Sequence, residues 1–111
     1  MGFLVAFNRK MYLTNYINGL EMKISDITSQ KLNMTDQISK LSSSISDLGD
    51  TDSPAVKKLE AKKIELENME RQLDSELQKI QTQLQAANTE IQSADSMLQE
   101  NIKKSFSYAG G

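Results

Sequence analysis

The feature that most constrains the fold is a pair of heptad repeats on either side of the only proline in the chain, Pro54. Apolar residues recur in alternating steps of four and three from Leu13 to Leu48, and in alternating steps of three and four from Val56 to Leu98. This spacing places one apolar stripe along each of two α-helices, as in a coiled coil. We call the a and d positions that form the two stripes the seam.

The segment between the two repeats has the residues of a helix end followed by a helix start. Gly49 follows the last apolar residue of the first repeat, where a left-handed backbone is favoured and glycine adopts it without strain. Ser53 and Pro54 suit the N-cap and the first position of a second helix. A connection of about four residues predicts that the two helices are adjacent and antiparallel.

We therefore predict an all-α fold, a long antiparallel two-helix coiled-coil hairpin that forms a single domain. The two repeats agree in phase with this turn, because stepping away from it pairs an a with a d in every layer, from Leu48 with Val56 to Leu20 with Leu84. The expected bounds are helix at about 3–48, turn at 49–53, helix at about 54–106 and a loose tail at 107–111.

Some seam positions depart from the bulky apolar pattern. Lys31 and Glu70 fall in neighbouring layers on opposite helices, close enough for a partial ion pair, and Lys63 interrupts a third layer. Polar seam residues cost stability and penalise shifted alignments, so we favour a register-setting role for all three over a ligand or proton site. Ala87 and Ala94 are small seam residues that either bring the helices closer or leave room for a packing group.

The composition argues against an enzyme. Histidine and cysteine are absent, which removes the commonest general base, the commonest nucleophile–base pairs and most transition-metal ligands. The 13 basic and 15 acidic residues give a net charge of −2, whereas binding to nucleic acid relies on clustered lysine and arginine. We expect no enzymatic activity, no cofactor, no metal and no nucleic-acid partner.

All the aromatic residues lie near the two ends of the chain, which a hairpin brings together. A patch of exposed aromatic and aliphatic side chains typically marks an interface. Self-association is the favoured interpretation; the rings could also plug the open end of the hairpin, or anchor it to a membrane surface beside Arg9 and Lys10. The candidate interface residues are Phe3, Leu4, Phe7, Tyr12, Tyr16, Ile102, Phe106 and Tyr108.

Two short segments resemble the needle subunits of type III secretion systems. Residues 52–56 (DSPAV) are similar to the proline-marked turn of that family, and residues 102–106 (IKKSF) are similar to its ending of isoleucine followed by phenylalanine. The resemblance implies a helical hairpin whose copies stack into a hollow filament, with the termini lining its inner part.

The expected function is a non-enzymatic structural subunit that forms a homo-oligomer through its terminal aromatic end, as a secreted or secretion-related filament. The alternative is a coiled-coil adaptor that binds a partner protein or a membrane surface through the same end. The apolar N-terminal segment is short and precedes its positive charges, unlike a secretory signal. We therefore expect a cytoplasmic location, or export without a cleavable signal peptide.

Overall fold

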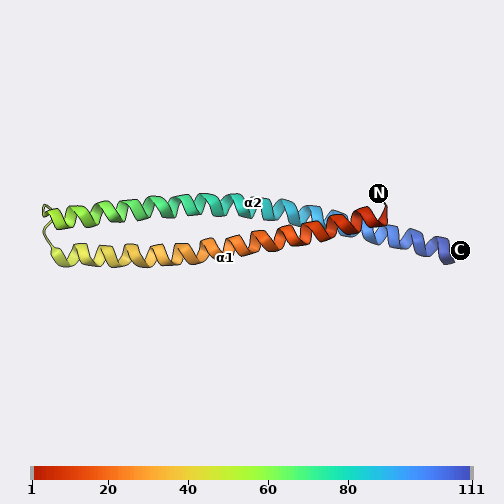
Figure 1. Cartoon of the computed structure of the whole chain (residues 1–111), viewed down its shortest axis with the longest axis horizontal. Coiled ribbons are helices and arrows are strands. Elements are labelled where there is room, and N and C mark those ends of the chain that lie inside the picture. Colours follow the sequence, from red (N-terminus) through yellow and green to blue (C-terminus); the bar gives the residue numbers. More distant parts are fainter. Residues whose placement is uncertain (1, 111) are drawn as a thin grey trace. The chain divides into compact units, whose positions relative to one another are not determined.

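A computed structural model describes the backbone of residues 2–110 and the side chains as far as residue 107. It contains two helices, α1 (Phe3–Leu48) and α2 (Pro54–Gly110), and no strand within the described residues. Figure 1 shows the two helices joined by a short turn. The all-α helical hairpin that the heptad repeats predict is confirmed.

The chain divides into two compact units, and the single domain that the sequence predicts stays a prediction. The terminal unit consists of residues 1–23 and 80–111, and the turn unit of residues 24–79. Each unit contains a stretch of α1 and a stretch of α2. A hairpin of this kind has no common core, because each seam layer contacts only the layers next to it, and its contacts are therefore local.

The turn has the backbone geometry that its residues predict. Gly49 has a φ of 69°, in the left-handed region, and its N–H donates to the carbonyl of Ile45 at 3.3 Å. At the start of α2, the hydroxyl of Ser53 accepts the N–H of Val56 at 3.1 Å. Ser53 is thus the N-cap of α2, with Pro54 at the first helical position.

Burial along the seam differs between the two units. In the turn unit only Ile27, Val56 and Leu66 are buried, and the other seam residues are half-buried apart from the exposed Leu48. The difference follows charge, since three charged seam residues (Lys31, Lys63 and Glu70) belong to the turn unit, against Lys10 in the terminal unit, and charged groups cannot be enclosed without a large desolvation cost. The buried seam residues of the terminal unit are Ala6, Leu13, Ile17, Leu20, Ile80, Ala87, Ala94 and Leu98.

The second helix ends later than the sequence predicts. Residues 107–110 of the expected loose tail belong to α2, and residue 111 lies outside the described part of the chain. The apolar repeat stops at Leu98, but neither proline nor glycine follows it before Gly110, so nothing in the sequence terminates the helix earlier.

The end of α2 extends beyond the start of α1 within the terminal unit. The seam pairing, carried to its last buried layer, places Ala6 opposite Leu98, and both side chains are buried. Because α1 begins at Phe3, the turns of α2 after Asn101 have no residue of α1 opposite them. In Figure 1 the blue end of α2 continues past the red start of α1.

Two glycines allow a matched test of the turn. At both Gly49 and Gly19 an added Cβ would meet no atom within 4 Å, so neither Gly→Ala change introduces a clash. Gly49→Ala should destabilise the protein by about 1 kcal/mol because an L-residue disfavours the left-handed region. Gly19→Ala, in the interior of α1, should stabilise it by about 1 kcal/mol. Thermal and urea unfolding, followed by circular dichroism, measures both changes. If the two substitutions changed the free energy of unfolding in the same direction, this account of the turn would be contradicted.

Candidate functional site

The terminal unit carries most of the exposed large apolar side chains. Every predicted interface residue whose side chain is described is exposed, from Tyr16 at 39 % to Phe106 at 78 %; the side chain of Tyr108 lies outside the described residues. Val5 and Met97 are also exposed there, although they are not among the interface residues that the sequence predicts. These side chains do not form one patch, because they separate onto two sides of the seam.

The first group surrounds Phe3 and Phe7. Their rings stack one helical turn apart, with centroids 6.2 Å apart and planes at 15°. Phe7 directly follows the seam residue Ala6 and therefore lies on the side of the seam where e positions lie. We call the group the phenylalanine face. Its members are Phe3, Leu4, Phe7, Met11, Ile102 and Phe106.

The ion pair between Lys10 and Asp95 indicates why Ile102 and Phe106 of α2 belong to this face. Lys10 Nζ lies 2.6 Å from Asp95 Oδ1 across the helix pair. Phe3 precedes Lys10 by one heptad and Ile102 follows Asp95 by one heptad, so these two apolar residues occupy the equivalent positions nearer the helix ends. Phe106 lies one turn beyond Ile102 on the same side of α2.

The second group surrounds Tyr12 and Tyr16. Their rings also stack, with centroids 6.3 Å apart and planes at 9°, and the guanidinium of Arg9 lies 5.5 Å from the centre of the Tyr12 ring. Arg9 forms an ion pair with Glu90 of α2. Arg9 and Tyr16 directly precede the seam residues Lys10 and Ile17, which places this group on the opposite side of the seam from Phe7.

Two adjoining hollows lie beside these tyrosines. One, of about 250 Å³, lies between the tyrosines and the stretch of α2 around Ala86 and Ala87. The other, of about 240 Å³, lies further along α2 around Ser93, Ala94 and Met97. Arg9 and Glu90 line both hollows. We call the two hollows together the tyrosine groove.

Small residues of α2 leave the room that the groove occupies. Ala87 and Ala94 are buried seam residues at its base, and Ala86 and Ser93 are exposed beside them. Of the two roles that the sequence allows for Ala87 and Ala94, leaving room for a packing group agrees with these hollows. The separation into two sides was readable from the sequence, because Phe7 follows a seam residue and Tyr16 precedes one.

In the turn unit, Lys31 does not pair with Glu70 as expected. Its ammonium forms an ion pair with Asp74, and Glu70 accepts a hydrogen bond from the hydroxyl of Thr35 at 3.2 Å. A lysine in the seam extends its amine to the edge of the helix pair, where the neighbouring flank supplies a half-exposed carboxylate. Lys31 and Glu70 are thus both satisfied across the seam, but by different partners.

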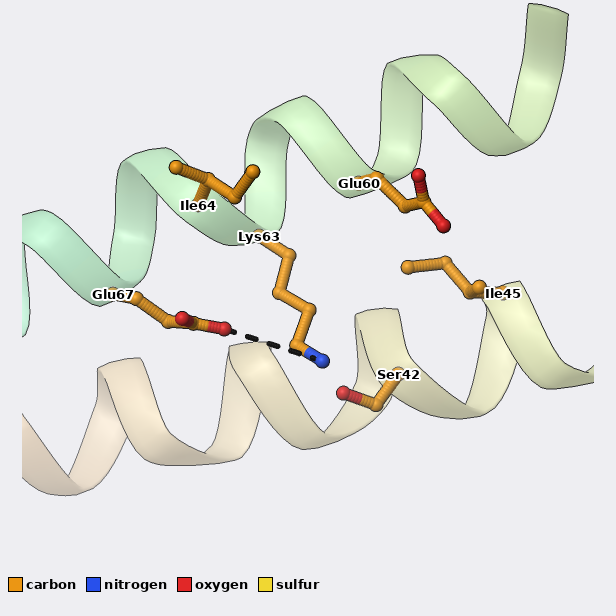
Figure 2. A pocket seen from close by; sticks show the side chains of 6 residues that line it. All are labelled: Ser42, Ile45, Glu60, Lys63, Ile64 and Glu67. Carbon is orange, nitrogen blue, oxygen red and sulfur yellow. Dashed lines mark ion pairs between the residues drawn. The ribbon is translucent and has the colours of Figure 1, made fainter. Parts of the chain in front are cut away.

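The third register-setting residue, Lys63, lies in a shallow hollow of about 300 Å³ in the turn unit. Figure 2 shows its side chain pointing from α2 toward α1, near Ser42, while Ile64 points away. The amine is 4.0 Å from Oε1 of Glu67, one turn along the same helix. Lys63 therefore contacts a carboxylate of its own helix, and the register-setting role of all three residues stays a prediction.

The part of the chain that the structure describes contains no group of three or more potential metal ligands. Its buried side-chain nitrogen and oxygen atoms all have hydrogen-bond partners. No described helix is both long enough and apolar enough to cross a bilayer. The most distinctive surface is accordingly that of the terminal unit, with its phenylalanine face and tyrosine groove.

The cost of the charged seam positions can be measured directly. Replacing Lys31 and Glu70 together with leucine should raise the stability by about 1 kcal/mol, because apolar burial outweighs the loss of half-exposed ion pairs and hydrogen bonds. The control pair is Asp36 with Lys40, an exposed ion pair of 3.0 Å outside the seam, where two leucines should give no gain. Thermal unfolding of both double variants measures the difference, and a loss of stability in the seam variant would contradict this prediction.

Comparison with known proteins adds no relative: the chain matches no protein-family model, no curated protein and no solved structure. The resemblance of residues 52–56 and 102–106 to needle subunits therefore stays a prediction. The functional argument rests on the two faces of the terminal unit.

Proposed function

We propose that this protein is a non-enzymatic structural subunit that self-assembles through its terminal unit, as a secreted or secretion-related filament. The observation that carries the proposal is the concentration of exposed aromatic and aliphatic side chains on the terminal unit. Single exposed apolar residues are normal on a soluble protein, whereas a group of exposed apolar side chains on one side of the helix pair, such as the phenylalanine face, marks a surface that is covered in use.

Stacking orders the exposed rings, and this order favours their contact with another surface. Phe3 with Phe7 and Tyr12 with Tyr16 each stack within α1, so each ring is held by its neighbour on the same helix. Ordered aromatic side chains lose little conformational entropy on association and bury a large area. A purely capping role would bury the rings across the helix ends, yet Tyr12 is 59 % exposed and Phe106 is 78 % exposed.

The filament and its link to secretion rest on the resemblance to needle subunits. Residues 102–106, which carry part of that resemblance, belong to the exposed end of α2, and Ile102 and Phe106 are both on the phenylalanine face. In the family that the resemblance names, subunits stack helically with their termini lining the inner part of a hollow filament. The terminal end of this chain has exposed apolar area that stacked copies would cover.

The alternative function is an adaptor that binds a partner protein or a membrane surface through the same end. Exposed Leu4, Val5 and Phe106 near Lys103 and Lys104 favour the membrane version. The cations of α1 favour it less, because Arg9 and Lys10 are already paired with Glu90 and Asp95. We therefore rank self-association first.

A concentration series tests the proposal. Sedimentation and light scattering of the full chain should show a mass that rises with concentration. Phe7→Ser with Phe106→Ser should raise the concentration of half-assembly at least tenfold, since fully burying one such side chain contributes about 1.5–3 kcal/mol and about 1.4 kcal/mol corresponds to a factor of ten. The control is Leu32→Ser with Ile64→Ser, which removes similarly exposed apolar residues from the turn unit and should leave assembly unchanged.

Two outcomes would contradict self-assembly. The first is a monomer at every concentration, and the second is an equal effect of the two double variants. Flotation of a monomeric chain with anionic vesicles, lost in the Phe7→Ser/Phe106→Ser variant, would instead support the membrane version of the adaptor.

A further inference from the structure

The contacts of the seam can be made within one chain or between two copies of it. In the hairpin, Leu20 of α1 lies opposite Leu84 of α2, and Leu48 lies opposite Val56. In a domain-swapped dimer, α1 of each copy would pair with α2 of the other copy and make the same contacts. The seam therefore favours neither arrangement. The choice depends on residues 49–53, which connect the helices, and on Pro54, the first residue of α2.

The spacing of the two repeats permits a single continuous helix. Val56 follows Leu48 by eight residues, which is close to two helical turns of about 3.6 residues each. A helix that continued from α1 into α2 would therefore place both apolar stripes on nearly the same side. The repeat would contain one inserted step of four residues, which coiled coils accommodate by local unwinding. A spacing of about nine residues would instead have placed the stripes on opposite sides.

Two residues of the connection oppose such a continuous helix. Inside a helix, Pro54 would have no N–H to donate to the carbonyl of Asp50, and its ring would clash with that carbonyl. Gly49 has a φ of 69° and is a poor helix former. In the hairpin neither residue is strained, because proline suits the first position of a helix and glycine suits the position after one.

The aspartates of the turn favour the hairpin as well. Oδ1 of Asp50 accepts the N–H of Asp52 at 3.0 Å, and the N–H of Asp50 donates to the carbonyl of Leu48 at 2.8 Å. In a continuous helix the inserted step would fall on Asp52, midway between Leu48 and Val56. Domain swapping would then place Asp52 of one copy in the seam opposite Asp52 of the other, where the two carboxylates repel each other.

We propose that the turn prevents domain swapping, so that Gly49, Asp52 and Pro54, rather than the seam, keep the chain a hairpin. Without these three residues, two copies would pair as an antiparallel dimer of continuous helices. This inference is independent of the proposed self-assembly, because a swapped dimer uses the seam and needs neither the phenylalanine face nor the tyrosine groove.

A turn variant tests this role of the three residues. It carries Gly49→Ala, Asp52→Ala and Pro54→Ala, which remove the two helix breakers and the carboxylate that would lie in the seam.

The control variant carries Gly19→Ala, Asp26→Ala and Ser39→Ala, at exposed positions of α1 outside the seam. Each variant loses one glycine and one aspartate, so the two are matched in net charge.

Cross-linking of a mixture of unlabelled and isotope-labelled chains shows which copies pair. The mixture is unfolded in urea and refolded before a carbodiimide is added. Lys10 Nζ lies 2.6 Å from Asp95 Oδ1 across the helix pair, so the reagent can join these two groups. In a hairpin both cross-linked peptides carry the same label, whereas in a swapped dimer about half of the pairs combine one labelled and one unlabelled peptide. Hairpins that associate side by side keep the same label in each pair.

The unmodified chain and the control variant should give pairs of one label only, and the turn variant should give mixed pairs. Mass spectrometry of the digested products measures both. Mixed pairs from the unmodified chain would overturn the proposal, because the turn would then not prevent swapping. Pairs of one label from a turn variant that is helical by circular dichroism would overturn it too.

A deletion keeps the proposal testable if the turn variant is not helical. Removing residues 51–54 shortens the step from Leu48 to Val56 to four residues and makes the heptad repeat continuous. This chain should form a helical dimer with mixed pairs. Loss of helix in the deletion variant, or pairs of one label only, would show that the seam does not pair between copies and would overturn the proposal.

Discussion

The packing of a against d side chains along the seam is the interaction on which the rest of the structure depends. It aligns the two helices in one register, and that register alone brings Arg9 to Glu90 and Lys10 to Asp95. It also determines on which side of the seam the remaining side chains are exposed. Residues that follow a seam position lie on one side, and residues that precede a seam position lie on the other. The positions of the phenylalanine face and of the tyrosine groove therefore follow from the packing of the seam.

The seam is built differently in its two units. In the terminal unit small and branched apolar residues are enclosed, and the surface charges next to them are paired across the helices. In the turn unit lysine and glutamate occupy seam positions and leave the layers around them half-buried. The well-packed stretch thus supports the surface with the exposed rings, and this rigid support would keep the proposed contact between copies in one orientation.

The sequence predicts the helices and the turn because apolar spacing and the chemistry of Gly49 and Ser53 act locally. It does not predict that Lys31 selects Asp74, because a long flexible amine can reach several carboxylates whose interaction energies differ little. The late end of α2 was missed because periodic apolar residues stop well before the helix does. The sequence places the aromatic residues near the two ends of the chain, but their division into two faces requires each heptad position to be assigned.

The final turns of α2 have no helix opposite them, and this has a thermodynamic consequence. Their backbone hydrogen bonds are open to water and few apolar contacts hold them, so local fraying there costs little free energy. A contact made through Phe106 must therefore also order the turns that carry it, and part of the binding energy offsets that loss of chain entropy. Because no helix lies opposite Phe106, a contact made through its exposed side chain would be weaker and more readily reversed than its exposed area suggests.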